Sequence, residues 1–285
     1  MDRMNPASRA FTYLFAWFFL QVPVDYTLDL IFANGAQPSS GPFSDFRLLQ
    51  YASQAIVVLF LTYTACRWWD QVPVHTLGYT WTSQCKRDLL AGLLIGGIGM
   101  GFVVLVELLT GWLDITGPAP SMVTALPRGL LVLGLMAYSE ETVFRGYLLQ
   151  NLDKAWGSGW AFLVSSLIFG LMHVPATDMT ATNPALVGMS VMLSSFVFAA
   201  AYYARRNLWL PIGLHFGWDL VQIGLGADSG WTLGGPIILE GHLCGPSQWV
   251  GCRAGVEVGL LSWVAMLLML LLVQGYGAWR HARTA

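Results

Sequence analysis

Apolar segments of about 20 residues follow one another along most of this chain, and each is long enough to cross a lipid bilayer. Of the 285 residues, 55% are hydrophobic and only 11% are charged. Soluble domains carry roughly one-quarter charged residues, so a soluble fold is excluded. The candidate segments lie near residues 10–30, 49–66, 88–113, 129–150, 159–175, 184–204, 208–226 and 255–278. We expect an all-α polytopic membrane protein of about eight transmembrane helices, forming a single domain over residues 1–285.

The distribution of basic residues predicts the orientation in the membrane. With both termini on one side, that side carries Arg3, Arg9, Arg67, Lys86, Arg87, Lys154, Arg205, Arg206, Arg280 and Arg283, and the other carries Arg47, Arg128 and Arg253. Short cytoplasmic loops are enriched in Lys and Arg, so we expect cytoplasmic termini in a cytoplasmic (inner) membrane. The basic residues form no single face, which argues against a nucleic-acid partner.

Three local features have interpretations of their own. The first segment has a basic start, Arg3 and Arg9, followed by an apolar stretch, as a signal peptide does. No small-residue cleavage site follows it, so we favour an uncleaved helix. Cys244 and Cys252 share one loop, where they form either a disulfide or two free thiols. Small-xxx-small spacings in the third segment predict close helix packing; its glycines are Gly92, Gly96, Gly97, Gly99 and Gly101.

Two carboxylates and a guanidinium interrupt the fourth apolar segment, in the sequence Ser139-Glu140-Glu141-Thr142-Val143-Phe144-Arg145-Gly146. An ionisable side chain at membrane depth costs about 2.5–3.5 kcal/mol on insertion scales, so such groups indicate a functional site. Glu141 and Arg145 lie one helical turn apart and can pair, whereas Glu140 points about 100° away and stays available. The alternative is a buried salt-bridge cluster that only locks helices together.

The two histidines within apolar segments are His173 and His215, and Asp219 follows His215 by one helical turn. Each alone is more often a satisfied core residue or a helix–helix hydrogen bond. Together with Glu140 they form a ligand set typical of catalytic zinc, and Asp219 could instead orient His215 or share in binding a cation. Both histidines need polar partners, and the central carboxylates are the ones available, so we expect the groups to converge.

The three residues can converge only if they lie at similar depths in the membrane. From the cytoplasmic ends of the predicted segments, Glu140 lies about 15 Å deep, His215 about 10 Å and His173 about 22 Å. Helix tilt or staggered helix starts must close the difference. Pro211 suits a first helical turn, which predicts that the seventh helix starts late, inside the bilayer.

Three ordered motifs resemble the signatures of the CPBP family, which comprises intramembrane CAAX proteases and bacteriocin-processing (Abi) enzymes and includes the Ras-converting CAAX endopeptidase. They are Glu140-Glu141-x-x-x-Arg145, Phe169-x-x-x-His173 and His215-x-x-x-Asp219, within about residues 125–222. The resemblance implies an eight-helix endopeptidase with a cavity open to the cytoplasmic side.

The resemblance also implies roles for the motif residues. Glu140 activates a water, His173 supports that water or a metal, and His215 with Asp219 stabilises the oxyanion, while Glu141, Arg145 and Phe169 support the site. Family members are treated as zinc enzymes or as metal-independent ones, so either Glu140, His173 and His215 hold zinc or no cofactor is needed. The family motif typically ends in Asn; an ionised Asp219 cannot donate a hydrogen bond to an oxyanion.

Two other functions fit these residues. Intramembrane Glu, His and Asp side chains also form proton relays, as in a proton-coupled transporter. A catalytically silent binding or immunity module would keep the same groups for structure, and the departure of Asp219 from the typical Asn leaves this alternative open. For a protease, the expected partners are the lipid bilayer and a peptide or membrane-associated protein; neither substrate identity nor its prenylation, nor an oligomeric state, follows from the sequence.

Overall fold

The computed structural model describes residues 4–35, 44–119, 122–174, 183–226, 238–251 and 255–282. The α-helices in these ranges are α1 (Pro6–Gly35), α2 (Asp45–Thr64), α3 (Ser83–Thr110), α4 (Met122–Glu141), α5 (Leu149–Trp156), α6 (Ser158–His173), α7 (Pro184–Arg205), α8 (Trp209–Gly224), α9 (Ser247–Val250) and α10 (Leu260–Ala282). Shorter helical segments connect or extend them: the π-helices η1 (Ala65–Asp70) and η3 (Thr142–Leu148), and the 3₁₀ helices η2 (Val74–Leu77) and η6 (Val256–Val258). The predicted all-α polytopic fold is confirmed.

All eight predicted apolar segments fall on helices, but the helices differ in length. Six ranges are long and apolar enough to cross a membrane: Pro6–Phe32, Asp45–Asp70, Ser83–Thr110, Met122–Trp156, Pro184–Arg205 and Leu260–Arg280. The remaining two, α6 and α8, have 16 residues each. At 1.5 Å per residue each is about 24 Å long, shorter than a hydrocarbon core of about 30 Å. The number of eight membrane crossings therefore stays a prediction.

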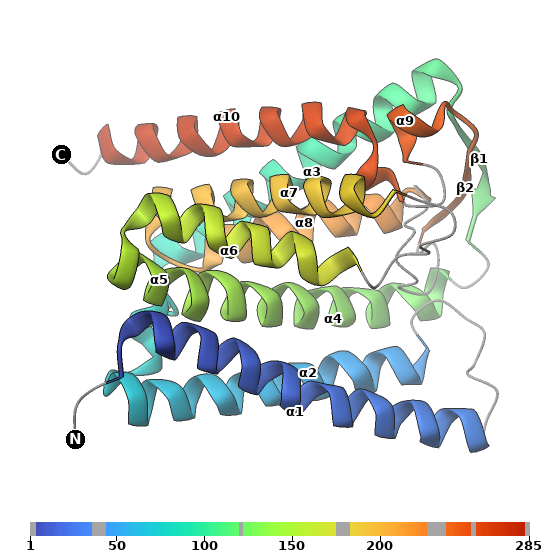
Figure 1. Ribbon diagram of the computed structural model, residues 1–285. Helices are drawn as coiled ribbons and strands as arrows, with labels where there is room; N and C mark the ends of the chain where they lie inside the picture. The colour runs from blue at the N-terminus through green and yellow to red at the C-terminus, as the bar shows by residue number, and fades with distance from the viewer. Residues whose placement is uncertain are drawn as a thin grey trace.

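The long helices lie side by side in one bundle, with α1 and α2 along one side and α10 along the opposite side (Figure 1). α1 begins and α10 ends at the same end of the bundle, which we call the terminal end. Strands β1 (Leu113–Pro118) and β2 (Leu239–Leu243) pair antiparallel at the other end, the strand end. The sequence did not predict these strands, because they lie far apart in the chain and meet only once the helices are placed.

Glycines bring α3 and α8 into backbone contact. A Cβ atom on Gly96 of α3 would lie 2.0 Å from the carbonyl oxygen of Leu214 on α8, and one on Gly213 would lie 2.2 Å from that of Leu89. No larger side chain fits at these positions without moving a backbone. The predicted role of glycine in close helix packing is confirmed. Because α8 carries two of the candidate site residues, this contact also sets where they lie.

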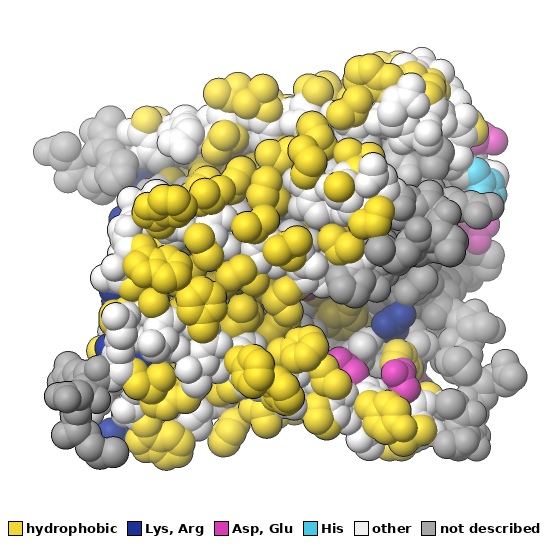
Figure 2. Space-filling model, in the orientation of Figure 1, with side chains coloured by type: hydrophobic (Ala, Val, Ile, Leu, Met, Phe, Trp, Pro, Cys, Tyr) yellow, Lys and Arg dark blue, Asp and Glu magenta, His cyan; other side chains and the backbone are white. Residues whose placement is uncertain are grey.

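Large hydrophobic side chains cover much of the face shown in Figure 2. On the outside of the bundle, Phe15 is 65% exposed, Ile56 67% and Leu271 63%. Soluble proteins seldom expose apolar side chains over such extended surfaces, whereas lipid stabilises them. The chain is an integral membrane protein.

The cysteines add little to the fold. Cys66 and Cys85 are buried, and Cys244 is exposed near the strand end. Cys252 lies outside the described residues, so its disulfide with Cys244 stays a prediction.

Candidate active site

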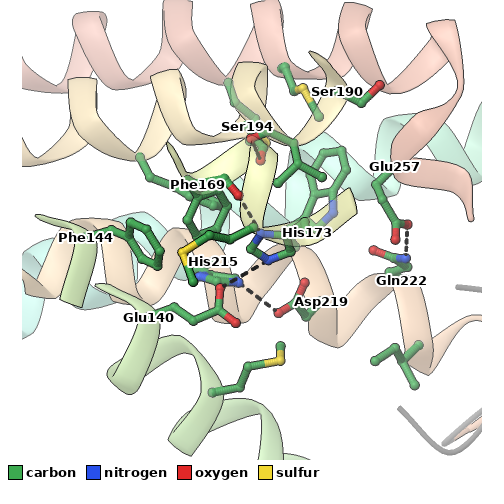
Figure 3. Close-up of a pocket in the computed structure, with 18 of the residues that line it drawn as sticks. Glu140, Phe144, Phe169, His173, Ser190, Ser194, His215, Asp219, Gln222 and Glu257 are labelled. Atoms are coloured by element: carbon green, nitrogen blue, oxygen red, sulfur yellow. Dashed lines mark hydrogen bonds and ion pairs between the residues drawn. The ribbon is translucent and has the colours of Figure 1, made fainter. Parts of the chain in front are cut away.

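A cavity of about 310 Å³ lies inside the bundle, and side chains from several helices line it (Figure 3). Glu140 comes from the last turn of α4, His173 from the end of α6, and His215 and Asp219 from α8. The structure therefore brings together four groups that the sequence places on three separate segments. Their remaining neighbours are mainly apolar or aromatic, such as Phe198 from α7.

Glu140 and His173 face each other across part of this cavity. The Nδ1 atom of His173 lies 2.7 Å from the carbonyl oxygen of Phe169, one turn earlier on α6. A carbonyl only accepts, so Nδ1 carries the proton and donates it. The other ring nitrogen, Nε2, lies 3.8 Å from Oε2 of Glu140. That separation exceeds a direct hydrogen bond, yet both atoms can bind one shared water molecule.

His215 lies between two carboxylates. Its Nδ1 atom is 2.9 Å from Oε1 of Glu141, and its Nε2 atom is 3.4 Å from Oδ2 of Asp219. The ring of Phe198 stacks on the imidazole, with ring centroids 4.8 Å apart and planes 16° from parallel. Hydrogen bonding at one edge and stacking on one face hold the imidazole in a single orientation, with Nε2 directed toward Asp219 and the cavity.

Arg145 lies behind the cavity, and its side chain is almost completely buried. The guanidinium donates to Glu141 at 3.0 Å and to the hydroxyl of Ser195 at 2.6 Å. Its central carbon also lies 4.6 Å from the ring centroid of Phe169 and 5.0 Å from that of Phe198. Arg145 thus pairs with Glu141, as their spacing predicts, and leaves Glu140 to the cavity.

Comparison with known families bears directly on this arrangement. Residues 122–221 match the family model described as Rce1-like, type II CAAX prenyl endopeptidase. The chain carries an Rce1-like domain. Comparison with curated proteins and with solved structures finds no match. The Rce1-like domain contains all four cavity residues named above and ends within α8, so α1 to α3 and α10 surround it from outside the matched range.

Helix ends explain how the Rce1-like domain brings its groups to one level. The fourth segment continues through η3 and α5 to Trp156, beyond the predicted end at residue 150, so Glu140 lies about 24 Å from the terminal end, near the depth of His173. Pro211 lies in the first turn of α8, as predicted. Asn207, just before α8, donates to Asp88 at 2.8 Å, and Asp88 already lies more than one turn into α3. The late start of α8 therefore moves His215 deeper.

The sequence analysis missed several residues of the site and one of the contacts made there. Ser195 and Phe198 lie on α7, where no motif marks them, and Glu141 was predicted to support Arg145 but not to bind His215. Gln222 and Glu257 line the same cavity, and Glu257 precedes the last helix, outside the Rce1-like domain. These contacts become visible only once α7, α8 and η6 are placed around η3. The signal that could have pointed to Glu257 is a lone carboxylate beside an apolar span.

The donor set does not form a ready zinc site. Among the residues that the structure describes, no three His, Cys, Asp or Glu side chains are grouped so that they could hold a metal ion. His215 has a carboxylate at each ring nitrogen, and His173 uses Nδ1 for a carbonyl. A zinc ion would need three converging ligands with one open position. We derive no chemical step through a metal.

Proposed function

We propose that this chain is an intramembrane endopeptidase in which Glu140 activates a water molecule for peptide-bond hydrolysis. The observation that carries the proposal is the buried Oε2 atom of Glu140, which has no hydrogen-bond partner among the described residues and faces Nε2 of His173 at 3.8 Å. Buried polar atoms are nearly always hydrogen-bonded, so a water between these two atoms is the natural partner. The Rce1-like match supports peptide hydrolysis as the reaction.

In the first step, Glu140 takes a proton from the water while the water oxygen attacks the carbonyl carbon of the peptide. A carbon–oxygen bond forms, and the carbonyl oxygen becomes an oxyanion. His173 accepts the second hydrogen bond of the water through Nε2, because its Nδ1 proton is held by the carbonyl of Phe169. A positioned general base of this kind contributes about 10²–10⁴ to the rate.

In the second step, Glu140 returns the proton to the amide nitrogen, the carbon–nitrogen bond breaks, and a carboxylic acid and an amine leave. We assign the oxyanion to His215, whose ring carries a proton on each nitrogen when both flanking carboxylates accept from it. Nδ1–H is held by Glu141, and Nε2–H, which lies 3.4 Å from Asp219 and faces the cavity, donates to the oxyanion without rotation of the ring. A donor held in place before the reaction needs no reorganisation as charge develops.

Asp219 has a different role in this scheme from the asparagine that is typical of the family. Ionised, it cannot donate to an oxyanion, but it can hold Nε2–H of His215 when no substrate is bound. The substrate is a peptide or a membrane-associated protein whose cleavable segment enters the bilayer. The apolar lining of the cavity, which includes Met136, Met172 and Trp218, suits such a segment.

The decisive experiment compares the wild type with Glu140→Gln in lipid nanodiscs, using a panel of internally quenched apolar peptides. We expect Glu140→Gln to fold normally and to lose cleavage by a factor of about 10²–10⁴. Glu107→Gln is the matched control, because Glu107 is a buried carboxylate on α3 that does not line the cavity. The proposal is contradicted if Glu140→Gln cleaves the peptides as fast as the wild type. It is also contradicted if the wild type cleaves none of them.

A further inference from the structure

One wall of the cavity is lined by two methionines from α10 and a tryptophan from α8. Met266 and Met269 lie about one turn apart on α10, and Trp218 directly precedes Asp219 of the candidate site. We call Met266, Met269 and Trp218 the methionine wall. These side chains line the same cavity as Glu140 and belong to one buried apolar cluster. Both methionines come from outside the Rce1-like domain.

A glycine on α3 leaves the space in which the side chain of Met269 lies. A Cβ atom on Gly99 would lie 2.2 Å from Sδ of Met269 and 2.5 Å from its Cγ, and 3.5 Å from Cζ3 of Trp218. The thioether of Met269 therefore lies directly against the backbone of α3. At Gly96, about one turn earlier, a Cβ would meet a backbone carbonyl of α8, which cannot move without the helix. At Gly99 a flexible side chain is what has to give way.

A displaced Met269 side chain would move toward the cavity. Protein interiors are close-packed, and Met269 is only 1% exposed, so its packed neighbours leave it little room. The cavity is the unfilled space that Met269 lines. A methyl group at position 99 would therefore push the thioether into the cavity and reduce the room beside Trp218. Methionine has three rotatable side-chain bonds and adapts to such a change, so the protein should stay folded.

We propose that the methionine wall, set back by Gly99, fixes the size of the apolar side chain that a substrate places against it. The proposal rests on the proposed function, because it treats the cavity as the peptide site. The wall offers apolar contact, and Trp218 is the chain neighbour of Asp219, so the substrate side chain is an apolar one close to the cleaved bond. The wild-type cavity accepts a side chain of leucine size there. Gly99, Met266 and Met269 are then specificity-determining residues from outside the Rce1-like domain.

The test measures binding separately from cleavage. Peptides with one apolar core carry Ala, Leu or Trp at each of three positions on either side of the central bond. Their affinities are measured by fluorescence anisotropy for Glu140→Gln protein in nanodiscs. We expect the Leu peptide to bind about tenfold or more tightly than the Ala peptide at one position, since one methylene in an apolar pocket is worth about 10–200-fold. Adding Gly99→Ala should remove this preference, and adding Met269→Ala should extend it to Trp.

A double variant tests whether Gly99 acts through Met269. In protein that already carries Met269→Ala, Gly99→Ala should change nothing, because the side chain that it displaces is gone. Gly101→Ala is the matched control on α3, because its Cβ would meet no described atom within 4 Å. Met266→Ala tests the enlarged cavity if Met269→Ala does not fold.

Three results would overturn the inference. They are an unchanged size preference in Gly99→Ala and Met269→Ala, an effect of Gly99→Ala that persists without the Met269 side chain, and no binding of any peptide. Size-selective binding that follows these variants without any wild-type cleavage would instead contradict the proposed hydrolysis. It would still support the methionine wall, so the two failures are distinguishable.

Discussion

Nδ1 of His215 lies 2.9 Å from Oε1 of Glu141, the same oxygen that accepts a hydrogen bond from Arg145 at 3.0 Å. One carboxylate oxygen therefore joins the buried guanidinium to the imidazole that faces the cavity. The two neighbouring glutamates therefore have different roles. Glu141 belongs to a buried network that sets the position of His215, and Glu140 meets the cavity.

The two glutamates should differ in their contribution to stability. Removing the charge of Glu141 leaves the guanidinium of Arg145 buried without its ion-pair partner, and breaking a buried pair costs about 3–5 kcal/mol. Glu140 has no ion pair with Arg145, so Glu140→Gln should cost little. Thermal unfolding of Glu141→Gln and Glu140→Gln in the same detergent checks this. Equal unfolding temperatures would show that Glu141 is not the stabilising partner.

Replacing Asp219 tests its assigned contact with His215. Asp219→Asn keeps the size of the side chain and a polar partner for Nε2 of His215, so we expect cleavage within about tenfold of the wild type. Asp219→Leu removes every polar contact and should lower kcat about 100-fold with a smaller change in KM. The measurement is steady-state cleavage of one quenched peptide. Similar rates for all three proteins would remove Asp219 from the mechanism.

Chelation should leave the rate of cleavage unchanged. His215 is engaged by carboxylates at both nitrogens, and no three described ligands converge to hold a metal ion. Purified protein is treated with 1,10-phenanthroline or with its non-chelating isomer, and cleavage and metal content are measured. Loss of activity with the chelator alone, restored by added zinc, would contradict the metal-independent mechanism.

Contact between α3 and α8 should be sensitive to a single methyl group. A Cβ on Gly96 would lie 2.0 Å from a backbone oxygen of α8, and overpacking of this kind costs about 1–3 kcal/mol. Gly101→Ala is the matched control on the same helix, because its Cβ would meet nothing within 4 Å. Comparing thermal unfolding of Gly96→Ala and Gly101→Ala tests the prediction. We expect only Gly96→Ala to unfold at a lower temperature and to lose peptide cleavage.

Hydropathy and motif spacing predicted much of this molecule. Each apolar segment is a helix because a backbone in lipid must satisfy its own hydrogen bonds. The motifs led us to expect that Glu140, His173 and His215 converge, and all three line one cavity. The Glu141 to Arg145 pair follows from helical spacing alone. These features depend on local chemistry, which a single sequence contains.

The features that the sequence did not predict depend on how separate helices lie relative to one another. The hydrogen bond between Glu141 and His215 depends on where α8 starts. That start is fixed by the hydrogen bond from Asn207 to Asp88 and by the glycine contacts between α8 and α3. The π-helical turn η3 has no marked sequence signal, and β1 and β2 pair only across the finished bundle. Such relationships arise from tertiary packing, so spacing within one segment cannot predict them.

The short length of α6 has a consequence for the surrounding lipid. If α6 crosses the membrane as predicted, a helix of about 24 Å in a hydrocarbon layer of about 30 Å would make the nearby acyl chains compress by about 6 Å. Leu163 and Leu167 are exposed on this helix, and the helix ends at His173. Such thinning would bring interfacial water closer to the imidazole of His173, so we expect a thicker bilayer to slow the proposed cleavage.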